Sequence, residues 1–327
     1  YSLLSFLLRQ NSSILVPDTP NSRSLHSQVV PKGGGLVIII STVSLIGIYQ
    51  AIYQSIAVMH VLIALLVGCI AVLGWFDDRH NLRIRTRIIM QIVIACAMVY
   101  LLARLQGINI AGYHLELPDW LLFVSIVVWV VWMTNLFNFM DGIDGLVSTQ
   151  STIATVVLAC WFYQEDAPNL VLLNMTLAGA LVGFSFHNWR PASVFLGDIG
   201  SLTLGIYFAV MGIIGWTVYR LPVEAFMLLY GVMFCDATVT LMVRILRRER
   251  WWEAHSSHFY QRLVRLGYNH AQVTSLAVMV TVCLSIYATL LIHERAPQWL
   301  WILLGGLTLT GCGLIIKHKE KKHLNLK

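Results

Sequence analysis

The chain has 327 residues, of which 57% are hydrophobic and only 12% are charged, and its mean hydropathy is +0.72. Soluble globular domains carry about 25% charged residues, so this composition excludes a soluble protein and indicates a polytopic membrane protein. The six cysteines all fall within hydrophobic runs and show no C-x-x-C spacing, which favours neither a disulfide framework nor a zinc site.

Hydrophobic runs long enough to cross a bilayer follow one another along the chain. Tyr1–Leu8 is far shorter than the roughly 20 residues that a span needs, so we expect it to be the end of a truncated first helix. Ten further spans are predicted, making eleven in the full protein. An all-α, polytopic single membrane domain over residues 1–327 is therefore predicted, without internal repeats. The predicted spans are 33–51, 55–76, 88–103, 119–138, 147–163, 168–186, 202–219, 222–245, 271–292 and 298–316.

Basic residues are distributed unevenly between the two sets of loops. If residues 9–32 lie inside, nineteen of the 22 Lys and Arg lie inside, and only Arg104, Arg220 and Arg295 lie outside. Lys and Arg concentrate on the cytoplasmic side of membrane proteins. The side that carries residues 9–32 is therefore predicted to be cytoplasmic.

The first polar motif on that side is Asp77-Asp78, at the end of a span, followed by Arg79, Arg83, Arg85 and Arg87. Carboxylates bind Mg²⁺, and guanidinium groups bind phosphate oxygens in bidentate fashion. The motif thus suits a site that holds both metal and phosphate. The alternative is a solvated loop whose arginines only fix topology.

The second motif lies within 135–146. Asn138, Asp141 and Asp144 step by three, so on a continuous helix they would share a face. Gly142 and Gly145 would let a ligand approach closely. A polar helix end with glycine breaks is the alternative, and the segment lacks the full ligand pattern of an EF-hand loop.

The third motif runs from Asn188 to Ser201 and places Asp198 between Gly197 and Gly200, just before a span. Backbone N–H groups at a helix start favour anions, and one carboxylate there can hold Mg²⁺ while pyrophosphate oxygens complete the shell. A plain turn with a helix cap is the alternative.

Two more cytoplasmic segments carry candidate ligands. Segment 247–262 contains His255 and His258, three apart, which could bind one phosphate; its Trp251 and Trp252 are typical of interfacial anchors. Segment 18–35 contains Asn21, Arg23 and His26 and then Pro31-Lys32-Gly33-Gly34-Gly35, a glycine-rich helix entry without the ending of a P-loop.

Asp236 lies about two turns inside its predicted span. It is expected either to pair with Arg244 or another buried cation, or to line the site.

The ordered set of motifs resembles a known family. Asp77-Asp78, the Asn138–Asp144 segment, Phe195-Leu-Gly-Asp198-Ile-Gly-Ser and His255-Ser-Ser-His258 are similar to the polyprenyl-phosphate N-acetylhexosamine-1-phosphate transferases. The resemblance covers about residues 16–270. It is strongest to bacterial enzymes that initiate O-antigen or related surface polysaccharides. The muramoyl-pentapeptide transferases of peptidoglycan synthesis carry three consecutive histidines where this chain has His-Ser-Ser-His, and they are the alternative branch.

The resemblance implies a reaction in the bacterial inner membrane. A UDP-N-acetylhexosamine and undecaprenyl phosphate would give undecaprenyl-diphosphate-sugar and UMP. Mg²⁺, with Mn²⁺ as a substitute, would be held by Asp198, with Asp144 as a second candidate ligand. Asp77, Asp78, Asp141 and Asp144 would be catalytic. The substrate-binding residues would be Asn138, Asn188, Arg83, Arg87, His255, His258, Asn21, Arg23 and His26.

The resemblance also suggests a homodimer, and no nucleic-acid partner is expected. Direct displacement is favoured because a phosphate monoester is already largely ionised at pH 7; a phospho-aspartate route is the alternative. A transporter is the hypothesis of a different class. Transporters place ionisable groups near the bilayer midplane, whereas the acidic residues here gather at one surface.

Overall fold

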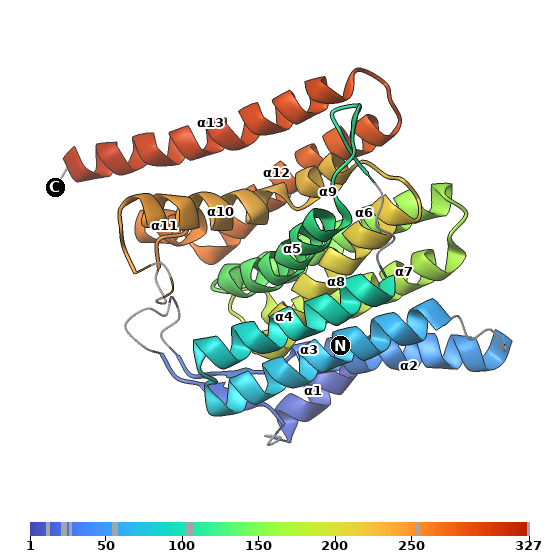
Figure 1. The fold of residues 1–327 in the computed structure, drawn as a ribbon. Coiled ribbons are helices and arrows are strands. Elements are labelled where there is room, and N and C mark those ends of the chain that lie inside the picture. Colours follow the sequence, from blue (N-terminus) through green and yellow to red (C-terminus); the bar gives the residue numbers. More distant parts are fainter. Residues whose placement is uncertain are drawn as a thin grey trace.

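The computed structural model describes residues 1–10, 14–20, 25, 28–53, 58–102, 107–250, 252 and 256–325. Within this part of the chain nearly all regular structure is helical, and the long helices run side by side as one bundle (Figure 1). Among the described residues, nine helices are long and hydrophobic enough to cross a membrane, and a bent pair makes a tenth candidate. The all-α polytopic fold predicted from the hydrophobic runs is confirmed.

The helices extend beyond several of the predicted runs because polar residues at their ends continue the hydrogen-bond pattern. Their bounds are α1 Ser2–Arg9, α2 Gly35–Tyr53, α3 Val58–His80, α4 Ile84–Leu102, α5 Asp119–Met140, α6 Leu146–Gln164, α7 Pro168–Asn188, α8 Gly197–Thr217, α9 Val223–Leu229, α10 Gly231–Leu246, α11 Phe259–Arg265, α12 His270–Ile292 and α13 Gln298–Asn325.

The predicted span 222–245 is not one straight helix. It consists of α9 and α10, which meet at Tyr230 at an angle of 85°. The Tyr230 hydroxyl donates a hydrogen bond to the Phe208 carbonyl at 3.3 Å, which ties the bend to α8. The apolar sequence on both sides of the bend gave no sign of it. Its consequence is that α10 carries Asp236 away from the axis of α9.

Two short antiparallel hairpins interrupt the helical pattern. Strand β1 (Val16–Asp18) pairs with β2 (Val30–Lys32), and β3 (Ile108–Ile110) pairs with β4 (Tyr113–Leu115). Neither hairpin was predicted from the sequence, because three-residue strands have no hydrophobic period of their own. The β1–β2 hairpin matters for function, since it lies against the segment that leads into α8.

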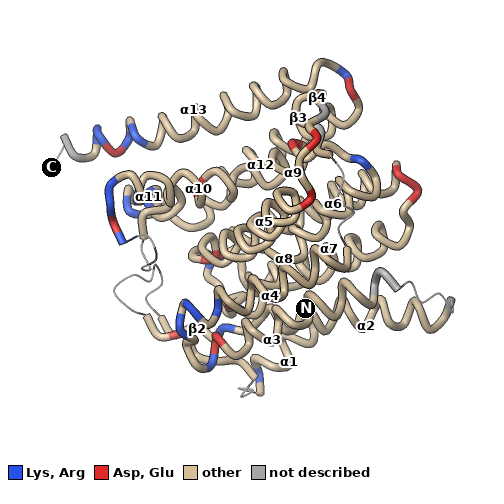
Figure 2. Tube along the Cα trace, viewed as in Figure 1, with Lys and Arg blue, Asp and Glu red and all other residues tan. Residues whose placement is uncertain are grey.

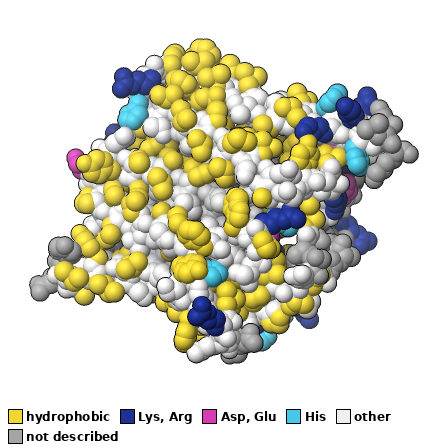
Figure 3. Space-filling model, turned by 180° about the vertical axis from the view of Figure 1, so that it is seen from behind, with side chains coloured by type: hydrophobic (Ala, Val, Ile, Leu, Met, Phe, Trp, Pro, Cys, Tyr) yellow, Lys and Arg dark blue, Asp and Glu magenta, His cyan; other side chains and the backbone are white. Residues whose placement is uncertain are grey.

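Helix α8 forms the centre of the bundle. Of the residues in its most hydrophobic stretch 94% are buried, whereas only 11% are buried in that of α13, which lies along one edge (Figure 1). Hydrophobic side chains cover much of the surface in Figure 3, with charged side chains mainly near its margins. In lipid, such exposed apolar side chains face hydrocarbon rather than water. The chain is therefore a multi-pass membrane protein.

Charged residues lie mainly at the two ends of the bundle. Figure 2 shows Lys and Arg gathered at the end that carries β2, α11 and the C-terminal part of α13. The ends of α3 and α5 and the beginning of α8 belong to this same end, as the contacts described below establish. The acidic residues of these helices therefore lie at the same end of the bundle as most of the Lys and Arg residues.

Candidate active site

The start of α8 is held by backbone pairing with β2. The Phe195 N–H donates to the Pro31 carbonyl at 2.8 Å, and the Gly34 N–H donates to the Phe195 carbonyl at 3.0 Å. The Gly35 N–H donates in turn to the Leu196 carbonyl at 2.9 Å. The amides of Gly34 and Gly35 are therefore committed to the backbone. The glycine-rich segment therefore packs closely against the start of α8, and these two amides are not available to bind phosphate.

Asp78 caps α8. Its Oδ1 accepts the Asp198 N–H at 3.1 Å, and its Oδ2 accepts the Ile199 N–H at 3.0 Å. Gly197 has φ +77°, and a Cβ at this position would lie 2.8 Å from Asp78 Oδ2. The sequence indicated that backbone N–H groups at this helix start favour an anion. For the amides of Asp198 and Ile199 that anion is the side chain of Asp78.

Lys32 completes the environment of Asp78, and it is not among the site residues that were predicted from the sequence. Its Nζ lies 3.2 Å from Asp78 Oδ1. Burial alone would lower the pKa of Lys32, but the carboxylates of Asp78, Asp198 and Asp18 raise it above the usual value. The ammonium group is therefore charged. The Pro-Lys-Gly-Gly-Gly sequence just before a span is the feature from which Lys32 could have been predicted as a site residue.

Asp77 is bound to the segment 79–87, which carries four arginines and is called the arginine loop below. Its Oδ1 accepts the Leu82 N–H at 2.9 Å, and its Oδ2 accepts Arg87 Nη1 at 3.0 Å. Arg87 also has a buried Nε that contacts no acceptor among the described residues. Arg83 is exposed. Of the two predicted phosphate-binding arginines, Arg87 is thus the one that the structure holds beside the acidic residues.

Asn138 and Asp198 form the centre of the acidic group. Asn138 Nδ2 donates to Asp198 Oδ1 at 2.7 Å and to Ser201 Oγ at 3.0 Å. Asp198 lies in the first turn of α8, rather than before the helix. A carboxylate oriented in this way by an amide keeps its other oxygen for a ligand.

Asp141 lies in the loop after α5, close to Asp198. Burial, followed by the charges of Asp198 and Asp78, raises the pKa of Asp141 to about 8. A hydrogen bond from the Gly197 N–H opposes this shift. The carboxyl groups of Asp78, Asp141 and Asp198 therefore form an electrostatically crowded cluster, called the acidic cluster below.

The predicted helical face of Asn138, Asp141 and Asp144 does not exist. Helix α5 ends at Met140, and α6 begins only at Leu146, after Gly145 with φ +77°. The two glycines do not leave space for a ligand on the side where a Cβ would lie. Gly142 makes room for the Tyr260 hydroxyl, and Gly145 for the Trp189 ring.

Asp144 has partners of its own. Its Oδ1 lies 3.1 Å from His270 Nδ1, and its Oδ2 accepts the Ala192 N–H at 3.3 Å. Burial would raise the pKa of Asp144, but His270, the Ala192 N–H and Arg190 together lower it below the usual value. Asp144 thus connects the loop after α5 to the start of α12.

Asn188 fixes the same loop. Its Oδ1 accepts the Gly145 N–H and the Ser148 hydroxyl, both at 3.1 Å, and its Nδ2 donates to the Val194 carbonyl at 3.0 Å. These contacts hold the segment before α8 against the start of α6. They position the backbone around the acidic cluster.

Asp236 pairs with His258 and not with Arg244. Its Oδ1 lies 3.0 Å from His258 Nδ1 and accepts the Phe259 N–H at 2.9 Å, while Oδ2 accepts the Tyr260 N–H at 3.1 Å. Asp236 therefore caps α11 and fixes the His258 ring. The Tyr260 hydroxyl then donates to the Phe139 carbonyl at 3.0 Å, which brings α11 against the loop that carries Asp141.

The remaining predicted residues, Asn21, Arg23, His26 and His255, lie outside the described residues. Within the described part of the chain, no three His, Cys, Asp or Glu side chains are arranged to hold a metal ion by themselves. The acidic cluster is nevertheless an all-oxygen donor set. Mg²⁺ usually takes only one or two carboxylates and completes its shell with phosphates and water, so the cluster fits a magnesium ion that arrives with a phosphate.

Comparisons with known proteins match the part of the chain that carries this site. Residues 58–216, which include the acidic cluster and the arginine loop, match the family model of glycosyl transferase family 4. This match agrees with the family predicted from the motifs.

Two curated relatives are similar to the chain over most of its length. The chain is 26% identical, over 86% of its length and 78% of the relative, to a probable undecaprenyl-phosphate N-acetylglucosaminyl 1-phosphate transferase of Bacillus subtilis (strain 168). It is 28% identical, over 69% of its length and 71% of the relative, to a phospho-N-acetylmuramoyl-pentapeptide-transferase of Wolbachia pipientis wMel.

Proposed function

We propose that this protein transfers N-acetylhexosamine 1-phosphate from a UDP-sugar to undecaprenyl phosphate, releasing UMP. The observation that carries this proposal is the acidic cluster, which lies beside Lys32 and Arg87 at the end of the spanning helices. A lipid phosphate reaches such a place from the bilayer and a nucleotide reaches it from water. The similarity to the Bacillus subtilis transferase supports the same reaction.

The basic residues of the site are suited to phosphate. Lys32 offers a compact ammonium, and Arg87 offers a planar donor set whose Nε contacts no acceptor among the described residues. Asp198, with Asp141 or Asp78 beside it, would hold Mg²⁺ in the presence of the sugar nucleotide. The ion would supply charge neutralisation on the pyrophosphate oxygens.

In the proposed reaction an oxygen of the lipid phosphate forms a bond to the sugar-bearing phosphorus. The bond from that phosphorus to the bridging oxygen breaks, and UMP leaves with this oxygen. Because the attacking phosphate is already largely ionised at pH 7, a general base adds little. Lys32, Arg87 and Asn138 therefore act by holding the two phosphate groups and the metal-binding carboxylate in position.

The contacts of Asp77 and Asp78 support direct displacement. Both oxygens of each carboxylate already accept hydrogen bonds, from Leu82 and Arg87 in one case and from the start of α8 in the other. A carboxylate engaged in this way is a poor nucleophile. A phospho-aspartate intermediate at either residue would first have to release these contacts.

We further propose that the site faces the cytoplasm of a bacterium, in its inner membrane, and that the reaction initiates O-antigen or related surface-polysaccharide synthesis. Nineteen of the 22 Lys and Arg fall on the side of the acidic cluster in the predicted topology, which supports the orientation. The His-Ser-Ser-His segment supports the surface-polysaccharide branch. The similarity to the Wolbachia enzyme makes the muramoyl-pentapeptide reaction the second candidate.

The test is UMP release by the purified protein in detergent, with undecaprenyl phosphate and Mg²⁺. The donors are UDP-linked GlcNAc, GalNAc, FucNAc and QuiNAc, and UDP-MurNAc-pentapeptide. Asp198→Asn removes the central carboxylate, and Asp119→Asn, an exposed residue in the first turn of α5, is the control. We expect release that requires lipid and Mg²⁺ and is lost only in Asp198→Asn. Release with the pentapeptide donor alone would favour the second candidate, and no release from folded protein would reject both.

A further inference from the structure

A buried pair of carboxamides joins α4 to α5 inside the bundle. Asn135 Nδ2 donates to Gln91 Oε1 at 2.6 Å, and it also donates to the Val131 carbonyl at 2.8 Å. A carbonyl oxygen can only accept, so the Val131 contact fixes which end of the Asn135 amide is the nitrogen. Only 2% of Gln91 and 5% of Asn135 is exposed. The two amides therefore meet away from the surface.

Each of the two amides has a polar atom without a partner among the described residues. Gln91 Nε2 and Asn135 Oδ1 are buried and contact no hydrogen-bonding group there. Hydrogen bonds between helices in a membrane add little to stability, whereas a buried polar group without a partner costs more than such a bond contributes. Two apolar side chains would hold α4 against α5 at a lower cost. Stability alone thus does not account for the pair.

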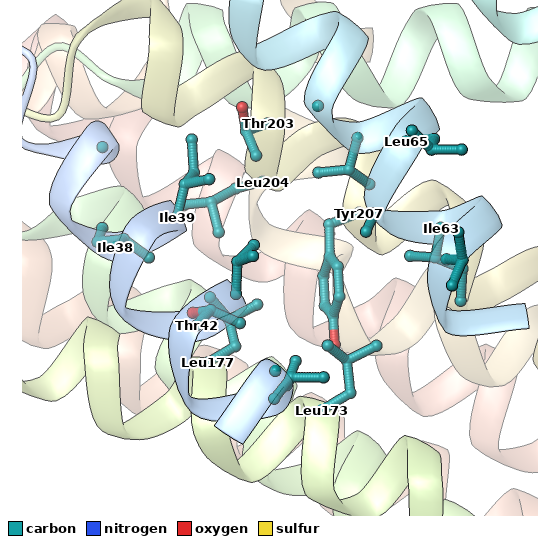
Figure 4. A pocket seen from close by; sticks show the side chains of 18 of the residues that line it. Ile38, Ile39, Thr42, Ile63, Leu65, Leu173, Leu177, Thr203, Leu204 and Tyr207 are labelled. Carbon is teal, nitrogen blue, oxygen red and sulfur yellow. The ribbon is translucent and has the colours of Figure 1, made fainter. Parts of the chain in front are cut away.

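A contact between α7 and α8 shows the difference from a fully paired amide. The Tyr207 hydroxyl donates to Asn174 Oδ1 at 3.0 Å, and Asn174 Nδ2 donates to the Leu170 carbonyl at 2.9 Å. The Tyr207 ring lines a hydrophobic cavity of about 380 Å³ whose walls come from α2, α3, α7 and α8 (Figure 4). Tyr207 follows Asp198 by nine residues, or about 14 Å along α8. Packing accounts for this contact, which lies away from the acidic cluster.

The Gln91–Asn135 contact, in contrast, lies one helical turn from two residues of the candidate active site. Gln91 follows Arg87 by four residues on α4, and Asn135 precedes Asn138 by three on α5, so each pair shares a helix face. Arg87 pairs with Asp77, and Asn138 orients Asp198. One hydrogen bond thus links the helix that carries the guanidinium to the helix that orients the central carboxylate.

We propose that the Gln91–Asn135 hydrogen bond positions Arg87 relative to Asp198 for the transfer step. The inference rests on the proposed function, in which Arg87 holds phosphate. Phosphoryl transfer needs the attacking oxygen, the phosphorus and the leaving oxygen roughly in line, so a shift of α4 along α5 would misplace the guanidinium. A hydrogen bond is directional, whereas an apolar contact is not. Gln91 and Asn135 are therefore positioning residues, which act through Arg87 and Asn138.

The test replaces both amides by apolar side chains, in the variant Gln91→Leu/Asn135→Ala, called the apolar variant below. This exchange keeps the summed side-chain volume nearly unchanged. We expect the apolar variant to unfold at the wild-type temperature or above it, because it removes the buried groups that have no partner. Its kcat for UMP release should fall about tenfold, while the KM of each substrate stays within about twofold of the wild type.

The matched control is a second buried glutamine that bonds across two helices. The Thr281 hydroxyl of α12 donates to Gln150 Oε1 of α6, and Gln150 Nε2 has no partner within the described part of the chain. The variant Gln150→Leu/Thr281→Val should therefore keep the wild-type kcat. The single variants Gln91→Leu and Asn135→Ala should each lose about as much kcat as the apolar variant, since either one breaks the same bond.

An unchanged kcat in the folded apolar variant, or an equal loss in the control, would overturn the positioning role. Single-variant losses that add up to the loss of the apolar variant would also overturn it, because the two amides would then act separately. A loss of kcat that comes with a lower unfolding temperature would show a merely structural pair. A wild type inactive with every donor would instead reject the proposed function, and this proposal with it.

Discussion

Replacing Asp141 by asparagine is expected to stabilise the metal-free protein and to abolish transfer. The Asp141 carboxyl lies among the charges of Asp198 and Asp78, and burial together with these charges raises its pKa to about 8 from the ordinary 3.8. An asparagine keeps an oxygen that can accept the Gly197 N–H, but it removes the charge. The variant thus removes the cost of protonating this carboxyl on folding, while it also removes a carboxylate that the reaction needs.

The size of the effect follows from the pKa difference. At pH 7 Asp141 is ionised in the unfolded state and protonated in the folded state. Because pH 7 lies about three units above the ordinary pKa, protonating the carboxyl on folding costs the wild type at most about 4 kcal/mol of stability. Solvent reaches the half-buried carboxyl and screens part of this, so we expect a gain of about 1–3 kcal/mol. Between pH 4 and pH 8 the folded state binds the additional proton, so wild-type stability should fall as pH rises through this window.

The assay is thermal unfolding in detergent with EDTA, from pH 5 to pH 9. Asp141→Asn should unfold at higher temperature than the wild type at pH 7 and should lose most of the downward slope. The matched control is Asp78→Asn, which disturbs the cap of α8 and the Lys32 ion pair. It should be destabilised by about 1–3 kcal/mol, the usual cost of a buried unsatisfied group. A lower unfolding temperature for Asp141→Asn, or an unchanged pH slope, would refute the reasoning.

Three further variants test other contacts. Lys32→Gln should lower kcat/KM for the acceptor by about a hundredfold with an unchanged unfolding temperature or a small decrease; an unchanged kcat/KM would remove Lys32 from the phosphate site. Asp236→Ala leaves His258 and the start of α11 without their acceptor and should cost about 3 kcal/mol in thermal unfolding; a cost under 1 kcal/mol would contradict the capping role. Asn188→Ala leaves the buried Gly145 N–H without its acceptor and should cost about 2 kcal/mol; an unchanged unfolding temperature would show that other groups hold this loop.

The spans were predictable because a bilayer imposes both a length and a composition on every crossing segment. The bend between α9 and α10 was not, because the apolar run continues through Tyr230 and the angle depends on packing against α8. The β1–β2 hairpin was missed for a related reason. Its second strand is stabilised by Phe195, more than 160 residues later.

The acidic residues could be found because carboxylates at the ends of apolar runs are costly and conspicuous. Their individual roles could not be found. Asp78 and Asp198 look alike in sequence, yet one caps a helix and the other is oriented by Asn138. The partners Lys32 and His270 were missed because an ion pair is defined by tertiary proximity. His270 belongs to no distinctive motif, and the glycine-rich motif of Lys32 does not indicate which carboxylate the lysine pairs with.

The cap of α8 also has a consequence for the order of biosynthesis. Asp78 precedes its backbone partner at Asp198 by 120 residues, so a growing chain contains this carboxylate long before the helix that it caps. Among the described residues that contact Asp78, Lys32 is made earlier. The lysine can therefore neutralise Asp78 while the later spans are inserted. The central helix then enters a bundle in which the acceptor for its first amides is already in place.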